Sequence, residues 1–152
     1  MGIFSKKPNI KKMWNNLDLK GLIKASKHSD PKVRFSAIGA LGEWFARSIK
    51  VATMFRLNTY ESEKGGDRLA LRAILDALKD EDEKVRRMAC FNVVFTMGVY
   101  ERADELASGD LNEEDRKSIS KIFKEFKEEF KKGMAQEECE ALDRGFSRIQ
   151  GL

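Results

Sequence analysis

Two stretches of this 152-residue chain repeat one another at an offset of 52 residues. Residues 19–37 align with residues 71–89, and both stretches carry an Asp, a Lys-Val-Arg triplet and an Ala in the same register. Self-similarity on this scale is typical of stacked structural repeats, in which each unit buries its apolar face against its neighbours. The repeat therefore predicts a short stack of similar units, and the length is that of one domain covering residues 1–152.

The composition favours helices throughout. Charged residues make up 36% of the sequence, there are only two prolines, and no run of alternating β-branched residues occurs. No apolar stretch approaches the roughly 18 residues that a membrane span needs, and no secretory segment is visible. We therefore expect an all-α chain, arranged as an α-α superhelix of stacked helical hairpins, in a cytoplasmic protein without a membrane partner.

Apolar residues at helical spacing divide the chain into three hairpins, each with an outer and an inner helix. The third hairpin lacks the Asp-x-x-Val-Arg signature of the first two, so it is either a degenerate repeat or a C-terminal helical hairpin cap. A short helix through Ile10, Met13 and Trp14 would cover the open end of the first repeat. The predicted units are repeat one at about 18–57, a loop at 58–67, repeat two at about 67–98 and the third hairpin at about 112–150.

Capping residues predict where the helices begin. Asp30 and Asp82 precede the two inner helices, where a carboxylate can accept hydrogen bonds from the free N–H groups of the first turn. Pro31 suits the first helical position. No helix breaker occurs before Asn58, so the first inner helix is predicted to be long, over about 31–57. The other predicted helices cover about 18–28, 68–79, 83–98, 99–108, 113–132 and 135–150, with Asp67 as the cap of the second outer helix.

The repeated segments resemble HEAT repeats, and the short bacterial and archaeal form also called PBS-lyase-like HEAT repeats most of all. The segments Asp30–Arg34 and Asp82–Arg86, each with an apolar run before it and an alanine three residues after it, carry the resemblance. It covers about 19–44 and 71–96. The resemblance implies that Asp30, Arg34, Asp82 and Arg86 form a structural ladder between successive inner helices. It implies a fold and leaves the function open.

No catalytic or metal-binding pattern is visible. The di-iron branch of HEAT-like enzymes needs several His-Glu pairs, and this chain has the single histidine His28. Lyase-like and glycosylase-like HEAT enzymes are remote alternatives. The acidic run at 80–83 lacks the spacing of a calcium loop and is expected to be a solvated turn. We expect no enzymatic activity, no cofactor and no metal, with Cys90 and Cys139 as small buried apolar residues.

Large apolar side chains occupy inner-helix positions that are usually polar in HEAT repeats. Inner helices line the concave face of such stacks, and exposed apolar patches need a cover or a partner. The long helix or the C-terminal hairpin could fold over this patch. The leading functional hypothesis is instead a scaffold whose concave groove binds an amphipathic helix or peptide of another protein. The candidate partner-binding residues are Phe35, Arg87, Met88, Phe91 and Phe95.

Basic charge is concentrated in the first third of the chain. Residues 1–57 carry 12 Lys and Arg against three acidic residues, a net of +9, while residues 58–152 carry 17 against 22, a net of −5. This asymmetry is compatible with dipolar solubility, with head-to-tail self-association, or with non-sequence-specific binding of nucleic acid or another polyanion. The candidate polyanion-binding residues are Lys20, Lys24, Lys27, Lys32, Arg47 and Lys50.

Overall fold

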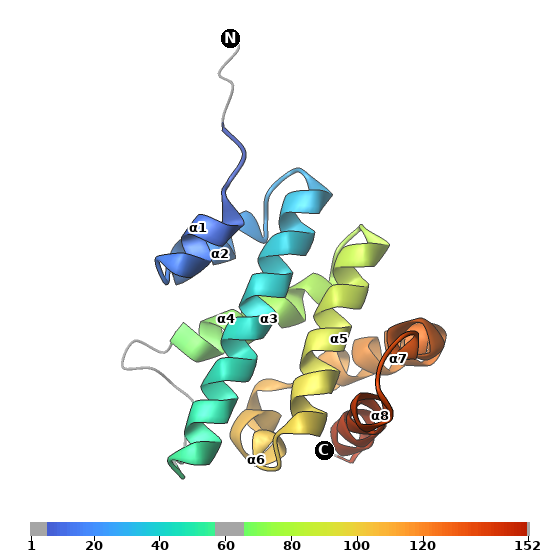
Figure 1. Cartoon of the computed structure of the whole chain (residues 1–152). Coiled ribbons are helices and arrows are strands. Elements are labelled where there is room, and N and C mark those ends of the chain that lie inside the picture. Colours follow the sequence, from blue (N-terminus) through green and yellow to red (C-terminus); the bar gives the residue numbers. More distant parts are fainter. Residues whose placement is uncertain (1–5, 57–65, 152) are drawn as a thin grey trace.

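A computed structural model describes residues 6–56 and 66–151, and over these ranges the chain is helical and contains no strand (Figure 1). The predicted all-α class is confirmed. The loop predicted at 58–67 lies outside the described residues except for its last two, which begin α4. The elements are α1 (Ile10–Asn15), α2 (Leu19–Ala25), α3 (Pro31–Met54), α4 (Gly66–Asp76), the 3₁₀ turn η1 (Ala77–Lys79), α5 (Glu83–Val99), α6 (Ala103–Ala107), the 3₁₀ turn η2 (Ser108–Asp110), α7 (Glu113–Lys131) and α8 (Gln136–Gln150).

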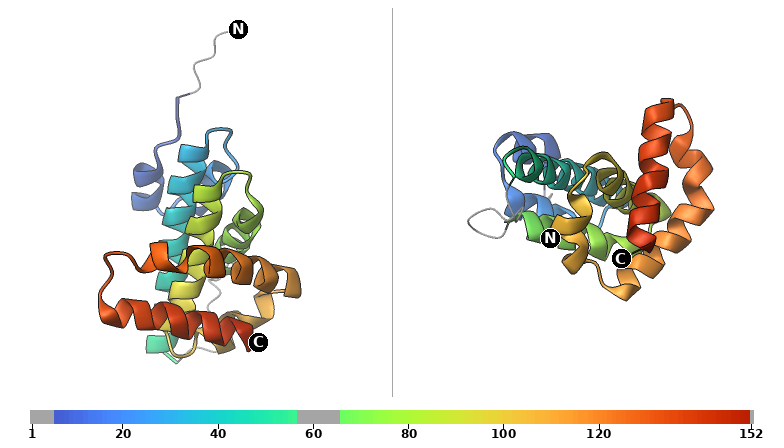
Figure 2. Two further views of the ribbon diagram at one scale, coloured as in Figure 1. Left: turned by 90° about the vertical axis from the view of Figure 1, so that its right-hand side faces the viewer. Right: turned by 90° about the horizontal axis from the view of Figure 1, so that it is seen from below.

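The two long helices α3 and α5 lie side by side and form one layer of the molecule (Figures 1 and 2). Helix α4 lies behind them, and the shorter α2 packs against both α3 and α4. Helix α1 packs against α2 and α3 at the outer side of this arrangement. There the rings of Trp14 and Trp44 meet edge to face, with their centroids 5.9 Å apart. The first helix therefore covers apolar surface that α2 and α3 would otherwise expose.

Helices α3 and α5 begin with the same hydrogen-bond pattern. The carboxylates of Asp30 and Asp82 each accept the backbone N–H two residues later at 2.9 Å. The backbone N–H of Asp30 also donates to Nδ1 of His28 at 3.0 Å, and the backbone N–H of Asp82 donates to Oδ1 of Asp80 at 2.9 Å. The 52-residue repeat in the sequence is thus matched by a repeat in local structure.

Several helix ends differ from the sequence prediction by a turn or less. Helix α3 ends three residues early, because Phe55 caps it and Arg56 takes a left-handed φ of 53° that does not continue a helix. Helix α4 begins at Gly66, so Asp67 lies in its first turn and is not its cap. The Asp67 carboxylate accepts the indole N–H of Trp44 at 3.0 Å instead. The helix predicted at 99–108 is replaced by α6 and η2.

The third hairpin does not continue the row of α3 and α5. Helices α7 and α8 lie crosswise to α5 (Figure 2). The backbones of α5 and α8 touch at two glycines, because a Cβ atom on Gly98 would lie 1.7 Å from the carbonyl oxygen of Ala141, and one on Gly145 would lie 1.9 Å from that of Val94. Only residues without a side chain allow this approach.

Two arginines of α8 hold this crossing in place. Arg144 donates from Nε to the carbonyl oxygen of Gly98 at 2.9 Å. Arg148 donates from Nη1 to the carbonyl oxygens of Met97 and Tyr100, at 2.7 and 3.1 Å. The last carbonyls of an α-helix lack partners within the helix, and cations at this end interact favourably with its dipole. Helix α8 therefore serves as the C-terminal cap of α5.

A continuous hydrophobic core connects α2, α3, α4, α5, α6, α7 and α8. Its largest fully buried side chains come from every hairpin, so the third hairpin is part of the same core despite its different direction. Burying side chains of this size stabilises the fold by roughly 1.5–3 kcal/mol each. They are Leu22, Ile38, Leu41, Phe45, Ile49, Leu71, Ile74, Leu75, Met97, Ile119, Leu142 and Ile149.

The two cysteines should differ sharply in reactivity. Cys90 is buried, as predicted, and burial raises the pKa of its thiol to about 12; Cys139 is only half-buried. At pH 8 about one Cys90 side chain in 10⁴ is then a thiolate, and the thiolate is the reactive form. Alkylation of the native protein should label Cys139 first, and Cys139→Ser should abolish the fast phase. Fast labelling that survives in this variant would contradict the burial of Cys90.

Candidate partner-binding pocket

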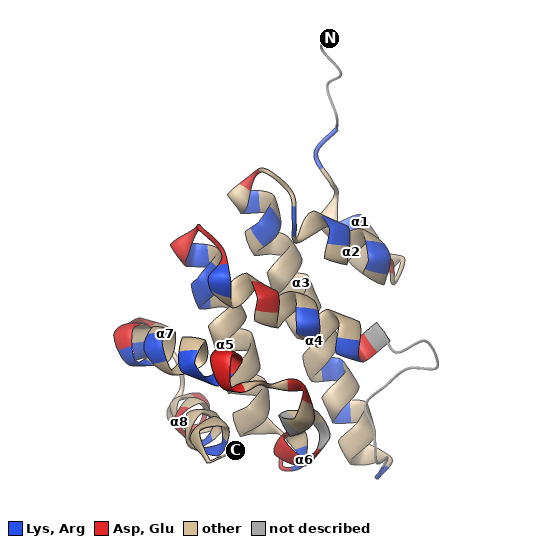
Figure 3. Cartoon of the chain, turned by 180° about the vertical axis from the view of Figure 1, so that it is seen from behind, with Lys and Arg blue, Asp and Glu red and all other residues tan. Residues whose placement is uncertain are grey.

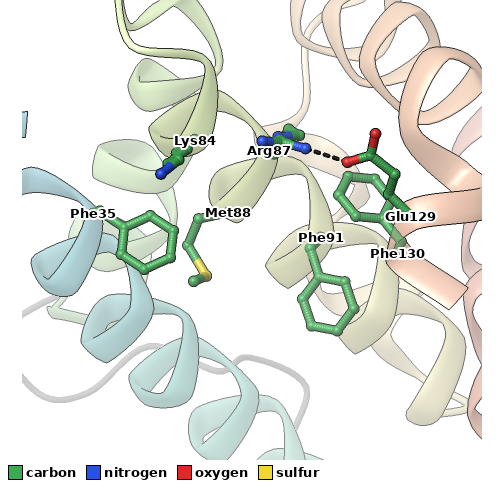
Figure 4. A pocket seen from close by; sticks show the side chains of 7 residues that line it. All are labelled: Phe35, Lys84, Arg87, Met88, Phe91, Glu129 and Phe130. Carbon is green, nitrogen blue, oxygen red and sulfur yellow. Dashed lines mark hydrogen bonds and ion pairs between the residues drawn. The ribbon is translucent and has the colours of Figure 1, made fainter. Parts of the chain in front are cut away.

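A cavity of about 380 Å³ opens between α3, α5 and the end of α7 (Figure 4). Its floor is apolar and its rim carries charges of both signs. Binding pockets in proteins commonly have volumes of about 300–1,000 Å³, with mostly apolar walls and a few polar groups that orient the ligand. The lining residues are Phe35 from α3, Lys84, Arg87, Met88 and Phe91 from α5, and Glu129 and Phe130 from α7.

Phe35 and Met88 face one another across the space between α3 and α5 (Figure 4). Phe35 is 37% exposed and has no ring contact with another described aromatic residue. The Met88 methyl group lies above α3 near Gly39, where an added Cβ would be 4.0 Å from it. The thioether side chain is flexible and adapts its shape to a neighbour. This side of the pocket is therefore open and adjustable.

Stacked aromatic rings form the opposite wall. The Phe91 ring lies parallel to Phe95, with centroids 5.4 Å apart, and is tilted against Phe130 at 5.9 Å. Phe130 contacts Phe123, which stacks on Phe146 at 4.4 Å. Such pairs contribute about 0.5–1.5 kcal/mol beyond the burial of their surface. The rings connect the pocket to the core of the third hairpin, so this wall is stiffer than the Phe35 side.

Ion pairs neutralise only some of the charged side chains at the rim of the pocket. Nη1 of Arg87 donates to Oε2 of Glu129, and the Arg87 guanidinium lies over the Phe126 ring, 4.7 Å from its centroid. Lys84 is exposed and forms no ion pair with a described residue. Among the described residues, the rim therefore offers the unpaired positive charge of Lys84 next to an apolar floor. An acidic group on a bound ligand would complement it.

Four of the five residues predicted to bind a partner line this pocket, namely Phe35, Arg87, Met88 and Phe91. Phe95 does not line it, but its ring stacks on that of Phe91. The C-terminal hairpin contributes one wall, through Phe130 and Glu129, so it borders the patch without closing over Phe35. Sequence reasoning did not include Lys84, Glu129 and Phe130. The sequence signal for Phe130 is its helical spacing from Phe123 and Phe126 on α7, and this spacing gives no information about a pocket.

The ladder residues take several different partners. Arg34 forms a two-pronged ion pair with Asp80, with Nε and Nη2 donating at 2.8 and 2.9 Å, and the two side chains are 8% and 11% exposed. This hydrogen bonding to Asp80 raises the pKa of Arg34. The expectation of a solvated turn at 80–83 is wrong for Asp80. Asp30 caps α3 and pairs with Lys7 at 2.7 Å, and Asp82 caps α5.

All six candidate polyanion-binding residues are exposed, and none forms an ion pair with a described acidic residue. Lys20 and Lys24 lie on α2, with Lys27 just after it, at helical spacing on one side; Arg47 and Lys50 lie near the end of α3. The basic bands on α2 and α3 are visible in Figure 3. The Arg47 guanidinium lies 6.0 Å from the centroid of the Trp14 ring.

Comparison with known proteins yields no relative: no protein-family model, no curated protein and no solved structure matches this chain. Within residues 6–56 and 66–151, no group of three or more His, Cys, Asp or Glu side chains is placed to hold a metal ion. In the same ranges, no helix combines the length and the apolar character of a membrane span.

Proposed function

We propose that this chain is a small HEAT-like helical-repeat scaffold that binds another protein through the pocket between α3, α5 and α7. The pocket carries this proposal, because an apolar floor with Phe35 exposed is costly on a surface that has no partner. The matching hydrogen bonds at the starts of α3 and α5 support the repeat, as does the side-by-side packing of these helices.

The most suitable occupant is an amphipathic helix with a bulky apolar residue and an acidic residue about one turn apart. The apolar side chain would enter between Phe35 and Phe91, and the acidic side chain would meet the free charge of Lys84. Buried aromatic or aliphatic anchors carry most of the energy in such complexes, while charges at the rim mainly set orientation and association rate. The flexible side chain of Met88 would adapt to the anchor.

Selection of peptides from a random display library on the full chain tests this proposal. Enriched peptides should share the apolar-acidic pattern, and Phe35→Ser should weaken their binding at least about tenfold, corresponding to ~1.4 kcal/mol of lost anchor contact. Lys84→Glu should weaken binding less. Fluorescence anisotropy with the selected peptide measures both effects.

Phe55→Ser is the matched control, because Phe55 is also an exposed phenylalanine (68%) but lies at the other end of α3, away from the pocket. It should leave the affinity unchanged. Phe91 is less suitable for the test, since its contacts with Phe95 and Phe130 also support the fold. Selected peptides that bind Phe35→Ser as tightly as the wild type would rule the pocket out.

We propose non-sequence-specific binding of nucleic acid as a second candidate function. One observation favours it: the exposed cations of α2 and α3 have no acidic partners among the described residues. Lysine contributes a point charge that suits phosphate contact rather than base reading. Binding to duplex DNA should weaken with salt by a log–log slope of about −0.9 per neutralised phosphate.

Charge reversal at the C-terminal end of α2 and just after it tests this candidate. Lys24→Glu with Lys27→Glu should weaken duplex binding and reduce the salt slope by about 1.8, if each lysine contacts one phosphate. The control is Lys124→Glu with Lys127→Glu on α7, which reverses two exposed lysines at the same spacing. Titrations of labelled duplex at low and moderate salt give the slopes. Equal losses for both pairs would show that only net charge matters, and no binding at low salt would remove the candidate.

A further inference from the structure

Arg34 and Arg86, at equivalent positions of the repeat, hold their guanidinium groups in the same way. Nη1 of Arg34 donates to the carbonyl oxygens of the residues six and five positions earlier, at 2.9 and 3.0 Å. Nη1 of Arg86 does the same, at 2.7 and 3.1 Å. Two hydrogen bonds to the backbone orient each guanidinium, so its opposite edge, formed by Nε and Nη2, points in a defined direction.

The two arginines differ in what meets that edge. In Arg34 the edge binds both carboxylate oxygens of Asp80 from the following hairpin. In Arg86 the same two nitrogens have no partner among the described residues, and the residue is only half-buried. The crosswise third hairpin explains the difference, because the first turn of α5 extends beyond α7 and α8 (Figure 2). Among the described residues, no carboxylate of the third hairpin pairs with Arg86 as Asp80 pairs with Arg34.

We propose that the open Nε–Nη2 edge of Arg86 binds the side-chain carboxylate of an acidic residue on another protein. The geometry of a guanidinium edge matches a carboxylate through two parallel N–H···O bonds. Arg34 and Asp80 demonstrate this match within the same chain, with the same backbone contacts holding the arginine. This site is separate from the aromatic pocket, whose lining does not include Arg86.

A second copy of this chain is a poor occupant. If a second copy placed its first hairpin beside α5, as the second hairpin lies beside the first, that hairpin would present His28 at the position equivalent to Asp80. An imidazole has no pair of acceptor oxygens for a guanidinium edge. The acidic groups nearest in the chain are otherwise engaged or solvated: Asp82 accepts two backbone N–H groups, Glu83 is exposed, and Glu81 is 89% exposed and lies 3.6 Å from Arg34. The occupant is therefore a different protein.

Side-chain NMR of the full chain tests the site with N-acetyl-aspartate N-methylamide as the probe. The Nε–H signal of Arg86 should shift saturably, with an apparent affinity at least about tenfold higher than that at the exposed Arg56, because two charge-assisted bonds form together. The Arg34 signal should not move, since its edge is occupied. The asparagine analogue, which lacks the charge, should leave Arg86 unshifted.

Arg86→Lys keeps the charge and removes the planar edge, so the saturable binding should disappear in this variant. The proposal is overturned if Arg86 responds no more strongly than Arg56, or if the asparagine analogue produces the same shift. Inorganic phosphate binding Arg86 more tightly than the aspartate probe would overturn it in favour of a phosphate site. The signals of Arg34 and Arg56 in the wild-type spectrum are internal controls, so the test remains valid even if Arg86→Lys is unstable. Phe35→Ser should leave the Arg86 response unchanged, which separates this site from the pocket.

Discussion

Replacing Gly98 by alanine should cost about 3 kcal/mol or more of the free energy of unfolding, because the new methyl group would overlap the backbone of α8. Its Cβ would lie 1.7 Å from the carbonyl oxygen of Ala141, and a helix backbone cannot yield as a flexible side chain can. The helices would have to separate, which would also break the bonds from Arg144 and Arg148 to the end of α5. Urea denaturation followed by circular dichroism measures the loss.

Gly39→Ala is the control for this prediction. It makes the same change within α3, where the added Cβ would meet only the flexible Met88 methyl group at 4.0 Å. Alanine is favoured over glycine in a helix by up to ~1 kcal/mol, so this variant should be as stable as the wild type or slightly more so. If Gly98→Ala were tolerated equally well, the close crossing of α5 and α8 would be wrong.

Replacing Asp80 by alanine should destabilise the chain by about 3 kcal/mol, because it leaves the largely buried guanidinium of Arg34 without its carboxylate. Both side chains are about one-tenth exposed, so water can compensate only in part. The double variant Arg34→Met with Asp80→Leu should recover much of the loss, since apolar residues of similar volume can replace a buried ion pair.

The surface pair of Arg72 and Asp76 provides the comparison. Asp76 is 60% exposed and pairs with Arg72 at 3.0 Å within α4. Asp76→Ala should cost no more than about 0.5 kcal/mol, because Asp76 is exposed and Arg72 keeps its two hydrogen bonds to Asp115. A similar cost for Asp80→Ala and Asp76→Ala would show that Arg34 and Asp80 do not act as a buried link between the two hairpins.

Much of the helical content could be predicted from local signals. The Asp30 cap with Pro31 after it and the Asp82 cap each mark the start of a long helix within a residue. The apolar spacing after Asp30 indicates the buried face of α3, and Ile38, Leu41 and Phe45 on that face lie in the core. These predictions succeed because capping and amphipathic periodicity involve residues at most one or two turns apart.

The candidate site was only partly predictable. The repeat register indicated that Phe35, Met88 and Phe91 lie together on inner helices, because equivalent positions of stacked repeats face the same way. It could not indicate that Phe130 and Glu129 form the other wall. Their contribution depends on the direction of α7, which no residue near them in sequence specifies.

Local signals in the sequence are enough to predict that this chain forms helices, where the long ones begin, and that two hairpins share one local design. The packing of whole helices sets the crossing of α8 over α5, the pairing of Asp80 with Arg34, and the lack of a partner for the Arg86 edge among the described residues. The reason is physical. Helix starts depend on hydrogen bonds between near neighbours, whereas the Arg34–Asp80 pair joins residues 46 positions apart. Such a contact exists only once whole helices have packed, and their packing angle depends on the combined shape of all the surfaces that meet.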